Sequence, residues 1–257
     1  MTRDGKDQPL WIVGQGSSLQ LRFYGQPGQG QYSREGVYVL QPAGDPTLSM
    51  TETLMPSPSA LAAIDHYTAT VHAEENFLYA PQVKEGDHWF WVDLPAPRSK
   101  TFTATLTSVA AGPGHVRLEV WGSTGGSQTP NHHLRLSING QAVADEKWGG
   151  IGRRTIEADV PASVLTNGDN QIRVEAPGDT GVLADITHVD WIEVRFPRLL
   201  VAQDDRLMFD SSGGSYTLSG FSGPIAVFDI TQPDRVTRLN RLAGTDQNPI
   251  VSGEAGR

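Results

Sequence analysis

Short runs in which apolar and polar residues alternate fill the chain from about residue 66 to residue 197. In the stretch TFTATLT, Phe102, Ala104 and Leu106 share one face while threonines occupy the other. The runs VRLEVW, LRLSI, TIEADV and QIRVEA have the same two-residue period. Successive side chains of a strand point to opposite faces, so this period predicts antiparallel strands with one buried and one solvated face.

Turn-forming residues separate these runs. Asn139 and Gly140 form the pair preferred in two-residue hairpin loops, where both positions need a positive φ. TNGDN and PGDTG interrupt the chain at 166–170 and 177–181, and helical periodicity is nearly absent. We therefore predict an all-β protein in which residues 65–197 form a jelly-roll-like β-sandwich.

The two ends of the chain differ from this middle part. Residues 1–50 and 198–245 carry only two to four strands each, too few to bury an apolar face alone. We expect them to pair as one discontinuous small β domain, with strands near 19–24 and 37–40 beside strands near 216–218 and 225–230. The stretch 51–64, which contains MPSPS, is expected to be a linker, and 246–257 a tail.

The composition excludes several classes of function. There are 29 acidic and 20 basic residues, which gives a net charge of −9 and disfavours nucleic acid as a partner. The chain has no cysteine, so disulfides, zinc–thiolate sites and a cysteine nucleophile are excluded. No apolar run approaches the roughly 20 residues of a membrane-spanning helix, and the first residues lack the apolar core of a signal peptide.

The stretch NHHLRLSINGQAVADEKWGG, residues 131–150, gathers the most chemical residue types. His132 and His133 are neighbours on a strand, so they point to opposite faces and cannot ligate one metal ion by simple strand geometry. Asp145 and Glu146 diverge for the same reason, which disfavours a paired-carboxylate glycosidase site. We predict a hairpin here without a metal or cofactor, and a structural calcium ion elsewhere stays open as an alternative.

Three tryptophans are the candidate ligand-binding residues. Trp148 ends the predicted hairpin, where its ring can either stack on a sugar or cap the edge of the sandwich. Trp89 and Trp91 share one face of HWFWVDL, which predicts either a carbohydrate platform or a covered central strand. No residue is nominated as catalytic or as a metal ligand.

Asp190 lies in the stretch DITHVDW, in the same two-residue phase as Ile192 and Val194. The phase predicts a buried or half-buried carboxylate that is hydrogen-bonded to a backbone loop.

Three segments follow one another in an order found in a known family. They are LRLSINGQAVADEKWGG, VLTNGDNQIRVEAPGDTG and HVDWIEVRFPR, flanked by LRFYGQPGQGQYSREGVYVL and FSGPIAVFDITQPDRVTRL. Together they resemble the jelly-roll region that precedes the catalytic domain of the gingipain-like cysteine peptidases. The resemblance covers most of residues 10–240 and implies a galactose-binding-type sandwich with a smaller β unit formed by the terminal strands.

The same resemblance sets the functional expectation. The family's catalytic His and Cys have no matching positions here, so it implies a non-catalytic amino-terminal region, secreted or at the cell surface, without its signal peptide. We expect an accessory region that supports or positions a downstream peptidase domain, or that binds another protein. The alternatives are a carbohydrate-binding module that uses the surface tryptophans and, less favoured, a β-sandwich glycosidase or esterase.

Overall fold

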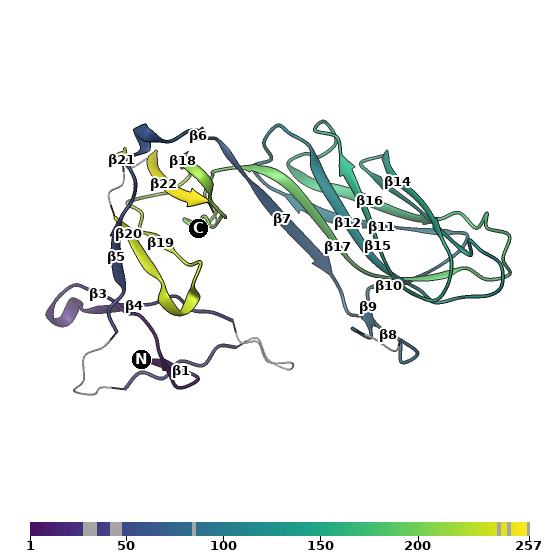
Figure 1. Ribbon diagram of the computed structural model, residues 1–257, viewed down its shortest axis with the longest axis horizontal. Coiled ribbons are helices and arrows are strands. Elements are labelled where there is room, and N and C mark those ends of the chain that lie inside the picture. Colours follow the sequence, from purple (N-terminus) through teal and green to yellow (C-terminus); the bar gives the residue numbers. More distant parts are fainter. Residues whose placement is uncertain (28–34, 42–47, 84–85, 241–242, 246–247, 256–257) are drawn as a thin grey trace. The chain divides into compact units, whose positions relative to one another are not determined.

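The protein folds into two compact units, both built from β-strands (Figure 1). The computed structural model describes residues 1–27, 35–41, 48–83, 86–240, 243–245 and 248–255. Residues 66–199 form one unit, called here the sandwich unit. Residues 1–65 and 200–257 form the other, called here the terminal unit. The expectation of an all-β protein with a jelly-roll-like sandwich is confirmed.

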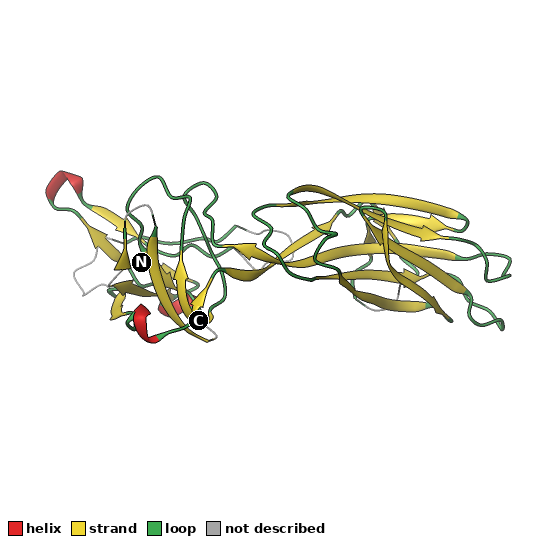
Figure 2. Cartoon of the chain, turned by 90° about the horizontal axis from the view of Figure 1, so that it is seen from above, coloured by secondary structure: helices red, strands yellow, loops and turns green. Residues whose placement is uncertain are grey.

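Two antiparallel sheets make up the sandwich unit (Figure 2). In the first sheet, β17 lies between β12 on one side and β7 and β10 on the other, and β15 follows β12. In the second sheet the order is β11, β16, β13, β14. The bounds of the first sheet are β7 (His66–Glu74), β10 (Val92–Pro95), β12 (Gly114–Gly122), β15 (Gly152–Val160) and β17 (Ile186–Leu199). Those of the second are β11 (Arg98–Leu106), β13 (His132–Ile138), β14 (Gln141–Trp148) and β16 (Gly168–Ala176).

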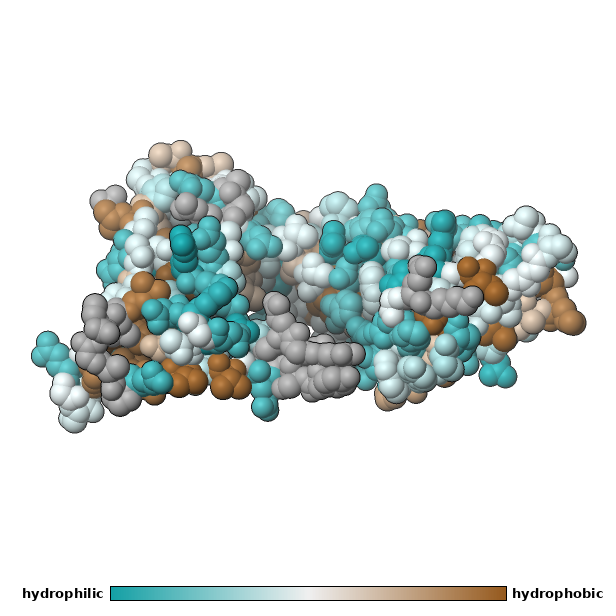
Figure 3. Space-filling view, turned by 60° about the horizontal axis from the view of Figure 1, so that its bottom comes forward, coloured by the Kyte–Doolittle hydropathy of each residue, from teal (hydrophilic) through white to brown (hydrophobic). Residues whose placement is uncertain are grey.

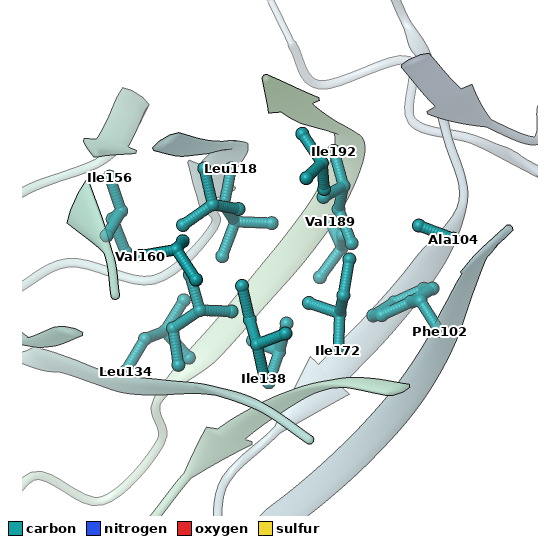
Figure 4. Packing of buried hydrophobic residues seen from close by; sticks show 14 of the residues in the cluster. Phe102, Ala104, Leu118, Leu134, Ile138, Ile156, Val160, Ile172, Val189 and Ile192 are labelled. Atoms are coloured by element: carbon teal, nitrogen blue, oxygen red, sulfur yellow. The ribbon is translucent and has the colours of Figure 1, made fainter. Parts of the chain in front are cut away.

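The apolar members of each alternating run meet between the two sheets. Leu118, Ile156 and Ile192 come from the first sheet and face Ile138 and Ile172 from the second (Figure 4). Each of these side chains is almost wholly removed from water. Burying a Leu or Ile side chain stabilises a fold by roughly 1.5–3 kcal/mol, so this layer makes a large contribution to the stability of the unit.

A β-bulge at Asp190 changes the side-chain phase of β17. Glu119 of β12 pairs with Trp191, whereas Val120 pairs with Val189, so one residue of β17 has no counterpart. Val189 and Ile192 therefore both face the core, although they are three residues apart. Asp190 does not share the core face with Ile192, because the bulge places it on the outer side of the first sheet with Trp191.

A short hairpin covers part of that outer side. It consists of β8 (Leu78–Tyr79) and β9 (Trp89–Phe90), which pair antiparallel. Phe90 packs with Ala80, Val83 and Trp121, the last of which belongs to β12. The hairpin is thus fixed by a second, smaller apolar cluster on the back of the first sheet.

The terminal unit joins strands from both ends of the chain. One sheet has the order β21, β22, β18, β6 and another the order β19, β20, β5, with β6 and β5 as parallel edge strands. Two hairpins, β1–β2 and β3–β4, complete it. The strands are β1 (Thr2–Arg3), β2 (Lys6–Asp7), β3 (Trp11–Val13), β4 (Gln20–Arg22), β5 (Thr51–Leu54), β6 (Ala63–Ile64), β18 (Ser212–Thr217), β19 (Val227–Asp229), β20 (Thr237–Asn240), β21 (Ala243–Gly244) and β22 (Pro249–Ala255). The single-turn helices in its described residues are η1 (Gly16–Ser18), η2 (Pro58–Ala60) and η3 (Pro233–Arg235).

The detailed pairing expected for the terminal strands is wrong. β4 pairs with β3, and Val39 bridges Thr2, so among the described residues neither 19–24 nor 37–40 pairs with the carboxy-terminal strands. The β3–β4 connection contains Gly14 and Gly16, both with positive φ. A short connection costs little loop-closure entropy, which favours this local hairpin over a long-range pairing.

Residues 51–64 and 246–257 also differ from expectation. The supposed linker contributes β5 and β6, and the supposed tail contains β22, which pairs with both β18 and β21. Proline is tolerated beside edge strands, where a backbone donor is not needed, so Pro56 and Pro58 do not keep this segment out of the sheets. No helix in the described part of the chain combines the length and apolarity needed to span a bilayer.

We expect Leu136→Ala to lower the free energy of unfolding by about 3 kcal/mol, because Leu136 is buried between the sheets and the cavity would not collapse fully. Urea denaturation of the purified chain measures this change. Leu183→Ala is the matched control, because Leu183 is fully exposed, and we expect it to change stability by less than about 0.5 kcal/mol. Equal effects of the two substitutions would contradict this assignment of the core.

Candidate functional site

The three candidate tryptophans occupy different environments. Trp148, at the end of β14, packs against the core of the sandwich and stacks on His132 with 5.0 Å between ring centroids. Its indole Nε1 is buried and has no hydrogen-bond partner among the described residues. Trp148 is half-buried, and the face of its ring that lies against His132 is not available to a sugar from solution.

Trp91 also packs inside the sandwich. Its ring lies 4.5 Å from that of Phe102, between centroids, and it packs against the core cluster. The chain bends at Trp91, between β9 and β10, so Trp91 and Trp89 do not share one strand face as their spacing predicts. The platform of two tryptophans predicted from HWFWVDL is therefore wrong.

Trp89 lies on the surface with two further aromatic residues. The exposed fractions are 43% for Trp89, 53% for Tyr79 and 75% for Phe77. Tyr79 pairs with Trp89 across the β8–β9 hairpin, and their ring centroids lie 5.1 Å apart. We call these three residues the aromatic face. Exposed apolar groups gathered at one place are a common mark of a binding surface.

The aromatic face is held from below by the smaller apolar cluster. Leu78, Ala80 and Phe90 alternate with the exposed rings and point towards Trp121. Backbone hydrogen bonds from Phe77 N to Phe90 O and from Ala80 N to His88 O extend the hairpin on both sides. Phe77 and Tyr79 were missed in the sequence, although the alternation in FLYA could have shown that they share one face with solvent.

Three buried histidines have both ring nitrogens occupied. His133 lies between Asp179 and Asp145, with Nδ1–Oδ1 and Nε2–Oδ1 distances of 2.5 Å and 2.8 Å. His132 Nδ1 lies 2.6 Å from Asp185 Oδ1, and its Nε2 lies 2.8 Å from the carbonyl oxygen of Thr124. His188 lies between Asp93 and Gln82 in the same manner. A general base needs a free nitrogen that can reach a substrate, so none of these three histidines meets that requirement.

Two buried carboxylates, Glu119 and Asp190, lie on the outer side of the first sheet. Glu119 accepts a hydrogen bond from Thr155 Oγ1 at 2.6 Å and forms an ion pair with Arg153 at 3.2 Å. Asp190 is also buried, but its Oδ1 has no hydrogen-bond partner in the described structure, so the backbone hydrogen bond expected for it is missing at this atom. Nowhere in the described ranges do three His, Asp or Glu side chains gather closely enough to hold a metal ion.

Burial raises the pKa of Asp190 to about 6, because the charged carboxylate loses its hydration. The nearby cation of Arg153 opposes this rise of the pKa, and the carboxylates of Glu74, Asp87 and Glu119 add to it. Asp190 is therefore an unfavourably placed charge at neutral pH.

The terminal unit contains an apolar cleft of about 1060 Å³. It is lined mainly by apolar side chains, and two of them, Leu54 and Met208, are 63% and 70% exposed. Figure 3 shows apolar atoms in brown along the lower edge of this unit, at the left of the picture. Further lining residues are Phe23, Phe209, Phe221 and Ile225. A cleft of this size accommodates side chains of a partner or an apolar ligand.

Comparison with solved structures identifies a similar fold along nearly the whole chain. Latent dimeric PorU from Porphyromonas gingivalis matches 97% of this chain with a TM-score of 0.68 and 14% sequence identity. The chain spans about a quarter of that protein, 26% of its length. This match agrees with the resemblance to the gingipain-like peptidases that the sequence motifs indicate.

Shorter matches cover about half of the chain. A CBM36 domain of a xylanase from the hindgut metagenome of Trinervitermes trinervoides aligns with 49% of this chain and 96% of its own, at a TM-score of 0.33 and 14% identity. A carbohydrate-binding module CBM36 in complex with calcium and xylotriose aligns with 49% of this chain and 98% of its own, at a TM-score of 0.32 and 19% identity. No protein-family model and no curated protein matches the sequence.

We expect Asp190→Asn to raise the free energy of unfolding by about 1–3 kcal/mol at pH 8 and to leave it nearly unchanged at pH 4. The folded pKa of Asp190, about 6, lies above its unfolded value of about 3.9. The free energy of unfolding of the parent chain is therefore highest below pH 4, where Asp190 is protonated. It falls as the pH rises through the folded pKa of about 6, because the buried carboxyl group ionises. Denaturation of both proteins from pH 4 to pH 8 measures this difference, and parallel pH profiles would contradict it.

Proposed function

We propose that this chain is a non-catalytic accessory region that supports or positions the catalytic domain of a gingipain-like peptidase. The observation that carries the proposal is the agreement in fold between 97% of this chain and about a quarter of PorU. A match to one region of a much longer protein favours a part that works together with other domains. The proposal includes export to the cell surface or the medium, as the resemblance implies.

The chemistry of the side chains supports a non-catalytic role. The chain has no cysteine to act as a nucleophile. The three buried histidines are bonded at both ring nitrogens, and their partners are carboxylates, a carbonyl and an amide. These contacts hold structure together and leave no paired base and nucleophile at these positions.

The apolar cleft of the terminal unit supports contact with another protein. Leu54 and Met208 present apolar side chains to water, and the partner would remove them from it. Burial of such residues at the centre of an interface usually provides much of the binding energy.

Binding to the catalytic domain of a gingipain-like peptidase from the same organism tests this role. We expect the chain to bind that domain in calorimetry and to raise its melting temperature, because a ligand of the folded state stabilises it. We expect Met208→Asp to weaken binding at least tenfold, while Leu183→Ala, on the sandwich unit, leaves it unchanged. Cleavage of Arg- or Lys-peptides by the pure chain, or no binding at all, would contradict the proposal.

Carbohydrate binding is a second candidate, supported by the aromatic face. Trp89, Tyr79 and Phe77 present ring faces to solvent, and a sugar ring packs on such faces through its apolar C–H groups. Exposed Glu75, Asn76 and Asp87 provide polar groups nearby for hydroxyl groups. Of the three tryptophans named from the sequence, Trp89 has the exposure that this function needs.

Isothermal titration with neutral oligosaccharides tests the second candidate. We expect binding that Trp89→Ala reduces at least tenfold, because the substitution removes the largest aromatic contact surface of the face; a tenfold change corresponds to about 1.4 kcal/mol. Leu199→Ala, a partly exposed aliphatic residue of β17, is the control and should leave binding unchanged. If no neutral glycan binds, or if Trp89→Ala binds as well as the parent chain, the aromatic face is not a sugar site.

A further inference from the structure

Loop 177–185, which connects β16 to β17, is attached to both faces of β13. His132 and His133 are consecutive residues of that strand, so their rings point to opposite sides of the second sheet. Each ring contacts a carboxylate from the same loop, Asp185 on the inner side and Asp179 on the outer side. The two histidines therefore hold one loop across the end of the strand.

The inner attachment is closed to water. His132 and Asp185 are both buried, and Asp185 Oδ2 also accepts the backbone N–H of His133 at 3.3 Å. The second nitrogen of His132 faces the carbonyl oxygen of Thr124, in the neighbouring loop 123–131. This loop is joined to loop 177–185 by a hydrogen bond from Gln128 Nε2 to Thr180 O at 2.6 Å.

The outer attachment is a cluster of alternating charges. His133 is buried between Asp179 of the loop and Asp145 of β14. Arg135 Nε donates to Asp145 Oδ2 at 3.0 Å, and Lys147 Nζ lies 3.5 Å from Asp179 Oδ1. Two carboxylates contact the imidazole directly, whereas both cations contact the carboxylates, so the charges nearest to the ring are negative.

The four ring nitrogens face four hydrogen-bond acceptors. Carboxylate and carbonyl oxygens accept and do not donate, so each contact needs an N–H on the ring. A neutral imidazole carries one N–H, and an imidazolium carries two. With neutral rings, one nitrogen lone pair of each histidine would face an oxygen lone pair inside the protein.

We infer that His132 and His133 form a proton-dependent clamp that orders loop 177–185 when both rings are protonated and releases it when they become neutral. In the protonated state all four contacts are hydrogen bonds, and three of them join opposite charges. In the neutral state two of the four contacts become repulsive. The loop carries the fully exposed Leu183, so its release changes the surface at this end of the sandwich unit.

Two further observations support the protonated clamp. Hydrogen bonds to His133 are the largest cause that lowers the pKa of Asp145 and of Asp179, so both carboxylates favour the ionised form that an imidazolium needs. The indole ring of Trp148 lies parallel to the His132 ring within 25°, at 5.0 Å between centroids. An aromatic face stabilises an adjacent cation.

Amide hydrogen exchange of residues 178–184 between pH 5.5 and pH 9 tests the clamp. After correction for the intrinsic pH dependence of exchange, we expect protection of these amides to fall at least tenfold as the pH rises. Residues 134–138 of the central strand β13 serve as the internal reference and should keep their protection. Equal protection of the loop at both ends of the pH range would overturn the inference.

Two variants separate a proton-dependent clamp from a merely structural contact. Asp179→Asn provides an amide that can donate to a neutral imidazole nitrogen, so we expect the fall in protection at high pH to become at least threefold smaller. His115→Gln is the matched control, because His115 forms an exposed pair with Asp159 on the first sheet and should not alter the loop. If Asp179→Asn keeps the pH profile of the parent chain, the inference is wrong. If Asp179→Asn does not fold, the pH dependence of amide exchange in the parent chain alone tests the inference.

Discussion

The pairing of β17 with three other strands holds the first sheet together. Its first residues, 186–189, pair with β10, residues 191–199 pair with β7, and residues 187–195 pair with β12 on the other side. The same strand supplies core residues and, through the bulge at Asp190, turns an acidic group towards the outer hairpin. The core, the buried carboxylate of Asp190 and the support of the aromatic face all depend on this one strand.

The sequence predicts the parts of the fold that follow from a two-residue period. Phe102, Ala104 and Leu106 are buried as their alternation indicates, and Asn139 and Gly140 both have the positive φ of the expected turn. The burial of Asp190 was predicted correctly, but the face of the sheet on which it lies was not, because the bulge shifts the phase and leaves no mark in the alternation itself. Strand pairing in the terminal unit could not be predicted either, since most of its strands have only two to four residues and carry too little pattern to choose a partner.

The candidate site, like the fold, was predictable only where a local sequence pattern determines the position of a side chain. The sequence identifies the tryptophans Trp89, Trp91 and Trp148 as candidates, but it does not show which of their rings are exposed. The exposure of these rings depends on the bend at Trp91 and on the stacking of Trp148 on His132, and both are features of the tertiary structure. The two histidines were correctly separated by strand geometry, since neighbours on a strand face opposite sides. Their shared attachment to loop 177–185 depends on residues more than 40 positions away and has no local signal.

The central proposal is that this chain serves a catalytic domain as an accessory region. The most direct measurement compares the peptidase activity and the folded yield of a gingipain-like catalytic domain produced with this region and without it. The account predicts that omission of the region lowers activity per cell at least tenfold, mainly through loss of folded protein. Equal yield and equal activity of the two preparations would contradict it.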